Sequence, residues 1–144
     1  MSGTYADLEV WQSAMEFAVR IYRLTKQYPK EEIYSLTAQL RRAAVSVASN
    51  IAEGKGRASD RELVQFLCHS RGSLFEIETQ LEIGKTLGYG SREEYVLLKS
   101  EAAKFGRVLN GLIRSVAPKE KAPLHFKVER DCSESLKPAF SVPS

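Results

Sequence analysis

Three acidic and imidazole side chains in this sequence share one helical face and could bind a metal. Glu62, His69 and Glu76 recur at intervals of seven residues, which aligns them along a helix. A di-iron site in a helical bundle needs a Glu-x-x-His pair on each of two helices and glutamates from the others. Neither His69 nor His125 follows a glutamate by three positions. We therefore expect a solvated face and no bound metal.

Other catalytic arrangements are not indicated by the residue order. The stretch Gly54-Lys55-Gly56 lacks the flanking residues of a phosphate-binding glycine loop. No Ser/His/Asp or Cys/His set stands in a recognisable order. We expect no cofactor, no catalytic residue and no enzymatic activity.

The basic residues gather between positions 41 and 71. That span holds six arginines and lysines and three acids, a formal charge of +3, and the whole chain of 144 residues also carries +3. Long basic side chains at turns and helix ends reach phosphates, through which proteins bind nucleic acids of any sequence. The candidate phosphate-binding residues are Arg41, Lys55, Arg57 and Arg61. A solvated surface with local ion pairs is the alternative, and an oligomer would repeat the patch so that its fields add.

A helix rich in small residues is predicted over 36–56 and carries two of these positions, Arg41 and Lys55. Its apolar seam has spacings of four and three and consists of Leu36, Leu40, Ala43, Val47 and Asn50. A polar stripe beside it consists of Arg42, Ser46, Ser49 and Glu53. Small core residues alone explain this spacing, but Asn50 also fits a hydrogen-bonded seam position that fixes register. We expect Gly54 and Gly56 to end the helix in the left-handed conformation.

Three further helices are predicted over about 7–27, 60–87 and 92–116. Ser59 with Glu62, and Ser91 with Glu94, form capping boxes at two of the starts, and Glu31 or Ser35 could start the helix at 36. Short loops force neighbouring helices to run antiparallel. The sequence therefore predicts an all-α, up-down-up-down four-helix bundle over residues 1–117, followed by an irregular tail over 118–144 with four of the five prolines. A short strand over 124–128 in that tail is a further possibility.

The first helix is apolar on two adjacent stripes, so it should contact two neighbours, which favours a closed homo-oligomer. If paired positions of the second and third helices add to about 115, Arg42 faces Ser73 and lies within reach of Glu76. Gly72 and Ser73 remove bulk at that point. We therefore predict a partly buried ion pair between Arg42 and Glu76.

The remaining features concern the cellular compartment in which the protein is expected. No apolar run approaches the roughly 20 residues that span a bilayer, and the N-terminus lacks the pattern of a signal peptide. Cys68 lies in an amphipathic segment, where a buried free thiol is expected. These observations favour a reduced, cytoplasmic setting without a membrane partner.

Three motifs stand in a fixed order along the chain: QLRRA at 39–43, SNIAEG at 49–54 and GSLFEIETQL at 72–81. Over residues 5–116 the sequence closely resembles the four-helix bundle family of bacterial 23S rRNA intervening-sequence proteins. The tail departs from that resemblance. The motif positions that match are Asn50, Glu53, Gly54, Gly72, Ser73 and Glu76, and we interpret them, with Arg42, as structural.

The resemblance implies a small up-down bundle whose biochemical role is in most cases not established. A related protein, the accessory variability determinant of diversity-generating retroelements, forms a homopentameric barrel whose basic surface binds nucleic acid and a reverse transcriptase. By this analogy we expect a homopentamer that binds RNA or DNA through phosphate contacts. The alternative is an oligomeric scaffold for a protein partner without nucleic acid. Salt-dependent binding to generic RNA or DNA distinguishes the two.

Overall fold

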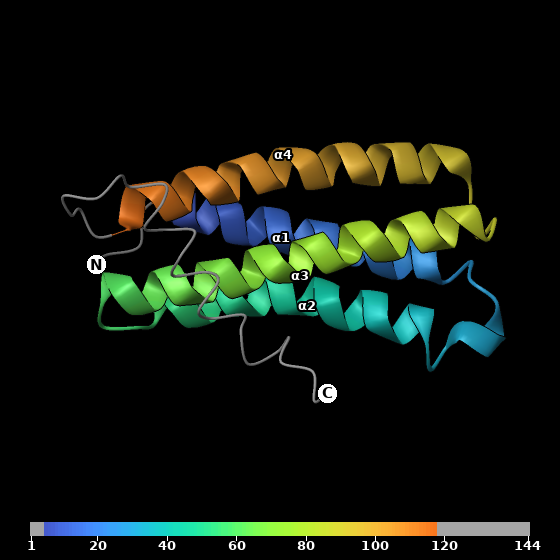
Figure 1. Cartoon of the computed structure of the whole chain (residues 1–144), viewed down its shortest axis with the longest axis horizontal. Helices are drawn as coiled ribbons and strands as arrows, with labels where there is room; N and C mark the ends of the chain where they lie inside the picture. Colours follow the sequence, from blue (N-terminus) through green and yellow to red (C-terminus); the bar gives the residue numbers. More distant parts are fainter. Residues whose placement is uncertain (1–4, 118–144) are drawn as a thin grey trace, which may run out of the picture.

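The computed structural model of the protein describes residues 5–117, with side chains from Glu9 onward. Four long helices lie side by side and alternate in direction (Figure 1). Their bounds are Tyr5–Thr25 for α1, Leu36–Lys55 for α2, Asp60–Thr86 for α3 and Arg92–Val116 for α4, with a short 3-10 helix, η1, at Lys30–Glu32. The all-α bundle is confirmed, and each long helix ends within two residues of its predicted bounds. The predicted tail and its short strand lie outside the described residues.

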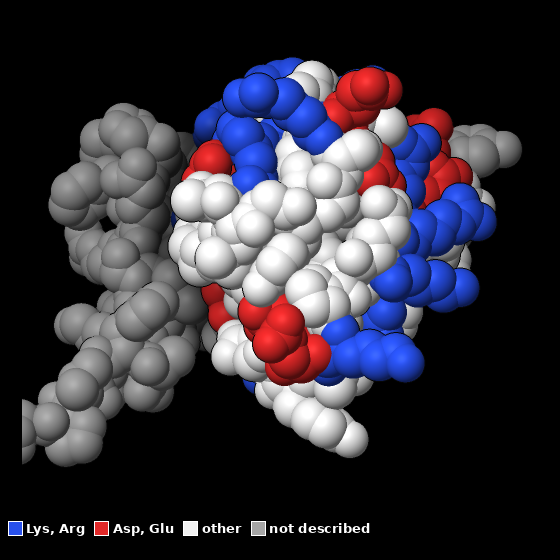
Figure 2. Space-filling view, turned by 90° about the vertical axis from the view of Figure 1, so that its right-hand side faces the viewer, with Lys and Arg blue, Asp and Glu red and all other residues white. Residues whose placement is uncertain are grey.

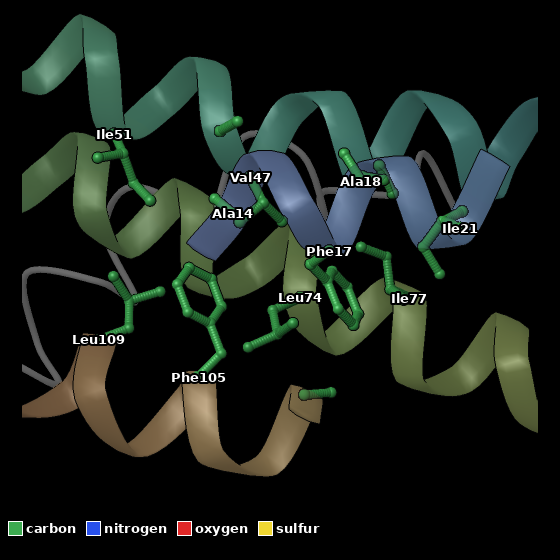
Figure 3. Packing of buried hydrophobic residues seen from close by; sticks show 14 of the residues in the cluster. Ala14, Phe17, Ala18, Ile21, Val47, Ile51, Leu74, Ile77, Phe105 and Leu109 are labelled. Carbon is green, nitrogen blue, oxygen red and sulfur yellow. The ribbon is translucent and has the colours of Figure 1, made fainter. Parts of the chain in front are cut away.

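The core is built from apolar side chains that all four helices direct toward the same axis (Figure 3). Phe17 of α1 and Phe105 of α4 lie near Leu74 of α3 in its middle, and alanines of α1 and α2 let these helices approach closely. Full burial of each large apolar side chain contributes about 1.5–3 kcal/mol. The fully or nearly fully buried residues include Ile21, Leu40, Val47, Ile51, Leu67, Leu74, Ile77, Leu81, Leu109 and Ile113.

Helix starts follow the predicted caps at α3 and α4 but not at α2. The Ser59 hydroxyl accepts the Glu62 N–H at 3.2 Å, and Ser91 forms a complete capping box with Glu94. At α2 the Ser35 side chain caps nothing. Instead Glu32 reaches forward, and its Oε1 accepts the Leu36 N–H at 3.3 Å and the Ser35 hydroxyl at 2.6 Å. Ser35 is thus the N-cap residue, as predicted, but its side chain does not cap the helix, and the carboxylate that does so belongs to Glu32 and not to Glu31.

The two glycines predicted to stop α2 act differently from expectation. Gly54 lies within the helix and is buried, and an added Cβ would come within 2.9 Å of Leu63 Cδ1 and 3.0 Å of Phe66 Cβ. Gly56 has φ −82°, an ordinary right-handed value. The left-handed prediction is wrong because the chain turns into α3 without a positive φ. Gly54 instead allows α2 and α3 to pack closely.

A chain of tyrosine hydrogen bonds joins the two connections at the other end of the bundle. The Tyr28 and Tyr95 hydroxyls lie 2.9 Å apart, Tyr95 also donates to the Tyr89 carbonyl, and Tyr89 donates to Glu32 at 2.8 Å. Burial, followed by the hydrogen bond to Tyr95, raises the pKa of Tyr28 far above its usual value. Hydrogen bonds from Ser35, Tyr89 and the Leu36 N–H lower the pKa of Glu32.

Two expectations about the setting of the chain can be compared with the described residues. Cys68 is 1% exposed, as expected for its face of α3. The expectation of a free thiol is wrong, because its sulfur is disulfide-bonded, so it gives no support for a reduced compartment. Within residues 5–117, no helix combines the length and apolar character needed to cross a bilayer.

Candidate nucleic-acid interface

The turn between α2 and α3 brings three of the four predicted phosphate-binding residues to one end of the bundle. Lys55 is the last residue of α2 and is half-buried, Arg57 is exposed in the turn, and Arg61 is exposed in the first turn of α3. We call these three residues the turn cluster. They come together because the connection is short, so the end of α2 and the start of α3 cannot separate.

Arg57 is held in place mainly by an aromatic ring. Its guanidinium lies 4.7 Å from the centroid of the Phe66 ring, the geometry of a cation–π contact. Its ion pair with Glu53 has a long N–O separation of 3.9 Å, and both side chains are more than 40% exposed. Such an exposed pair contributes little. The ring therefore positions the guanidinium and leaves its N–H groups available for a phosphate.

Acidic residues stand close to the turn cluster. Glu53, Asp60 and Glu62 balance its three positive charges, so residues 53–62 have no net charge. Glu62 accepts a hydrogen bond from the Ser59 hydroxyl at 3.3 Å. Asp60 lies in the first turn of α3, where its negative charge interacts favourably with the positive end of the helix dipole. Binding here has to rely on discrete contacts of Arg57 and Arg61 with phosphates, because no single-sign field extends from this segment.

Arg41, the fourth predicted residue, is not part of this cluster. Its Nε donates to the Thr25 hydroxyl at 2.9 Å, and its guanidinium lies 4.8 Å from the centroid of the Tyr22 ring. Fourteen positions of α2 separate Arg41 from Lys55, about 21 Å at roughly 1.5 Å per residue. The four candidates therefore do not form one site, and Arg41 ties α2 to α1.

The opposite end of the bundle also carries basic side chains. This end holds the α1–α2 and α3–α4 connections and faces the viewer in Figure 2. An uncharged centre is surrounded there by basic side chains, which gather along the right-hand edge and at the upper left, and by acidic side chains that lie among them and below the centre. The charged residues of this end therefore form a rim around the uncharged centre.

The polar motif residues of α2 and α3 meet along the contact between the two helices. The Asn50 Nδ2 donates to the Ser46 carbonyl at 2.8 Å and to the Ser46 hydroxyl at 2.9 Å. The Ser46 and Ser73 hydroxyls lie 2.8 Å apart, and the Ser70 hydroxyl donates to the Val47 carbonyl at 2.8 Å. The two bonds that cross between the helices, from Ser46 to Ser73 and from Ser70 to Val47, fix the register of α2 against α3, and Asn50 orients Ser46 from within α2.

The predicted ion pair between Arg42 and Glu76 is wrong for the single chain. Both side chains are exposed, and the ion pairs within the described residues are Arg20–Glu101, Arg57–Glu53, Lys85–Glu82 and Lys99–Glu82. The paired positions 46 with 73 and 47 with 70 add to 119 and 117, not to about 115. Arg42 and Glu76 thus lie level with each other, but they point outward from the contact and away from its buried side.

The α3 face that carries Glu62, His69 and Glu76 is exposed. Residues 9–117 contain no group of three metal-ligating side chains that converge. Sequence reasoning missed Phe66, whose ring positions Arg57 from the next helix. It also missed Glu32, which joins η1, α2 and Tyr89. No spacing pattern marks either residue, because each contact crosses between elements.

Comparison with known proteins places this architecture in a family. The family model described as 23S rRNA-intervening sequence protein matches residues 6–111. No curated protein sequence matches the chain significantly. The crystal structure of a protein of unknown function from the S23 ribosomal protein family of Bacteroides thetaiotaomicron VPI-5482 is similar, with a TM-score of 0.70 and 26% identity over 76% of this chain and 98% of that one. The chain therefore belongs to the family of 23S rRNA-intervening sequence proteins.

Proposed function

We propose that this protein is a non-enzymatic homo-oligomer that binds RNA or DNA by phosphate contacts from its turn cluster. The observation that carries this proposal is the convergence of Lys55, Arg57 and Arg61 at one end of the bundle, with Arg57 supported by the Phe66 ring. Cyclic symmetry about an axis parallel to the helices would place every copy of the cluster on the same side of the assembly. Several weak phosphate contacts would then act together.

An apolar groove between α1 and α2 supports self-association. The groove has a volume of about 640 Å³ and is lined mainly by apolar side chains. Three of its residues, Met15, Val19 and Val45, are exposed by 43–45%, which is unusual for aligned apolar side chains on a monomer. We call it the α1–α2 groove. Its lining includes Trp11, Met15, Val19, Tyr22, Arg23, Lys26, Val45 and Ala48.

The proposal is tested by measuring mass and binding together. Light scattering at micromolar concentration gives the number of copies, and fluorescence anisotropy follows titrations of single- and double-stranded RNA and DNA. We expect a closed oligomer that binds all four nucleic acids, with an affinity that falls steeply between about 50 and 200 mM salt. A monomer mass rejects the oligomer, and absence of binding to all four at 50 mM salt rejects the nucleic-acid function.

A second candidate function is an oligomeric scaffold for a protein partner. It is favoured by the uncharged centre of the end surface in Figure 2. The connections at that end also carry exposed apolar side chains, since Tyr34 is 93% exposed, Ile33 45% and Leu87 54%. An apolar centre inside a charged rim is the usual anatomy of a protein interface. An oligomer that binds none of the four nucleic acids would favour this candidate.

A further inference from the structure

A second groove also runs along α2 and lies on the side of this helix that faces α3. It lies between the start of α2 and the second half of α3 and has a volume of about 510 Å³. We call it the α2–α3 groove. Leu36, Ile83 and Leu87 form its apolar part, and Glu32, Glu76 and Gln80 are among its polar residues. The two grooves occupy adjacent sides of the bundle and share α2 as their common edge.

The charges of the two grooves are opposite. The α1–α2 groove holds Arg23 and Lys26, whereas the α2–α3 groove holds Glu32 and Glu76. Within the described part of the chain, neither Arg23 nor Glu76 takes part in an ion pair. Each groove also presents exposed apolar side chains. The two surfaces are therefore complementary in charge, and both can bury apolar side chains against each other.

One buried atom in the α2–α3 groove is also unsatisfied. Gln80 is 9% exposed, and its Oε1 is the buried side-chain atom that has no hydrogen-bond partner among residues 9–117. An unpaired buried acceptor costs about 1–3 kcal/mol. A contacting surface that provides an N–H or O–H donor would remove this cost.

The groove residues lie at matching heights along the bundle. Arg41 contacts Tyr22 and Thr25 of α1, so Arg23 lies at the height of Arg41. The α2–α3 register, with paired positions that add to 117–119, places residues 76–78 of α3 at that same height. Arg23 and Glu76 are therefore level on two adjacent sides of the molecule.

We propose that the α1–α2 groove of one copy packs against the α2–α3 groove of the next, with Arg23 of one copy paired to Glu76 of its neighbour. This inference rests on the proposed homo-oligomer and assigns its two contacting surfaces. Copies related by an axis parallel to the helices stay at equal heights, so the pair forms without any shift along the bundle. The contact is head-to-tail, and such contacts close into rings when the rotation allows.

The position of α2 decides what faces the ring axis. Adjacent sides of a four-helix bundle point about 90° apart, so each copy turns by roughly a right angle relative to the next, and the contact can close into a small ring. The edge shared by the two grooves points to the axis. Arg42 of α2, which is exposed and lines neither groove, then faces the central channel.

Charge reversal tests the pairing in the full chain. Light scattering compares the parent with Arg23→Glu, Glu76→Arg and the double variant, and circular dichroism checks that each variant folds. Both side chains are exposed, so folding should be retained. The matched control is Arg107→Glu, because Arg107 is exposed on α4 and lines neither groove. We expect each single reversal to raise the dissociation constant at least about tenfold, and the double variant and the control to assemble like the parent.

The outcomes separate this inference from the function on which it rests. A parent protein that is monomeric rejects the oligomer and the pairing together. An oligomeric parent whose single reversals assemble normally, or whose double variant stays dissociated, rejects the pairing alone. Mixing the two folded single variants gives an independent measurement, since each contact between unlike variants joins opposite charges. Failure of the mixture to form heavier species also counts against the pairing.

Discussion

The hydroxyl groups of Tyr28 and Tyr95 lie 2.9 Å apart, although 67 positions separate the two residues in the chain. Tyr28 follows α1 and Tyr95 lies in the first turn of α4, so this contact joins the first and last helices. Gly84 of α3 makes room for both rings, because a Cβ at that position would come within 2.2 Å of the Tyr28 hydroxyl. This hydrogen bond therefore lies where α1, α3 and α4 come together at one end of the bundle.

The tyrosine contact predicts a loss of stability at alkaline pH. The pKa of Tyr28 is raised in the folded state above its ordinary value of 10.0, and burial also raises the pKa of Tyr95. The folded chain therefore holds these protons more tightly than the unfolded chain. Their contribution is fully present below about pH 10 and is lost as the pH rises above it. Melting temperatures should be level from pH 7 to 9 and fall above pH 10. The fall should be shallower for Tyr28→Phe, and an equal fall would contradict the assignment.

The hydrogen bonds of Glu32 predict a loss of folding stability at acidic pH. Its pKa is lowered in the folded state, first by the Ser35 hydroxyl and then by Tyr89 and the Leu36 N–H. The stabilisation it provides is present above its unfolded pKa of about 4.5 and is lost as the pH falls through the lower folded value. In denaturant titrations from pH 3 to 6, Glu32→Gln should lose part of the acid dependence of the parent. Glu31→Gln is the control, and a matching loss in that variant would show that the effect is not specific to Glu32.

Two glycines give a matched test of close helix packing. In Gly54→Ala the new methyl group would meet Leu63 Cδ1 at 2.9 Å and Phe66 Cβ at 3.0 Å, whereas in Gly111→Ala it would meet nothing within 4 Å. Alanine gains up to about 1 kcal/mol of helix propensity at either position, but overpacking costs about 1–3 kcal/mol at Gly54. Denaturant unfolding should show Gly111→Ala stabilised and Gly54→Ala destabilised by about 1 kcal/mol. Equal stabilisation of both variants would rule out the tight contact.

The turn cluster predicts a specific pattern of binding defects. Replacing Arg57 and Arg61 with alanine should weaken binding to all nucleic-acid sequences about equally and should flatten the dependence on salt, because phosphate contacts carry no sequence information. Anisotropy titrations at several salt concentrations measure both effects. Arg41→Ala is the control, since its guanidinium is engaged with Thr25 and Tyr22 about 21 Å away. If the double variant binds like the parent, the cluster is not the site.

The fold was predictable because its signals are local. Apolar residues at spacings of three and four mark helices wherever they pack, and Ser59 and Ser91 mark helix starts by side chains that reach only three residues ahead. The position of Arg42 was not predictable in the same way. Its distance to Glu76 depends on the rotation of α2 and α3 about their axes, and no single helix contains that information.

Sequence spacing alone also could not show that Arg41 lies apart from the other three predicted phosphate-binding residues. Lys55, Arg57 and Arg61 lie in or beside the short α2–α3 turn, so their closeness in the sequence was enough to predict their closeness in space. Arg41 shares α2 with Lys55 alone, and residues along a helix are separated by roughly 1.5 Å for each position. The aromatic partner of each arginine, Phe66 or Tyr22, comes from another element.

The two ends of the bundle should differ in the free energy needed for local opening. At one end, hydrogen bonds between Gln27 and Glu94, Tyr28 and Tyr95, and Glu32 and Tyr89 join connections that are 57–67 positions apart. At the α2–α3 turn, the side-chain contacts of Ser59 and of Glu53 reach only three or four positions along the chain. Amide hydrogens beside the turn should therefore exchange with solvent earlier than those beside the tyrosines. The end that carries the turn cluster would then be the one able to adjust its backbone to a bound polyanion at small cost.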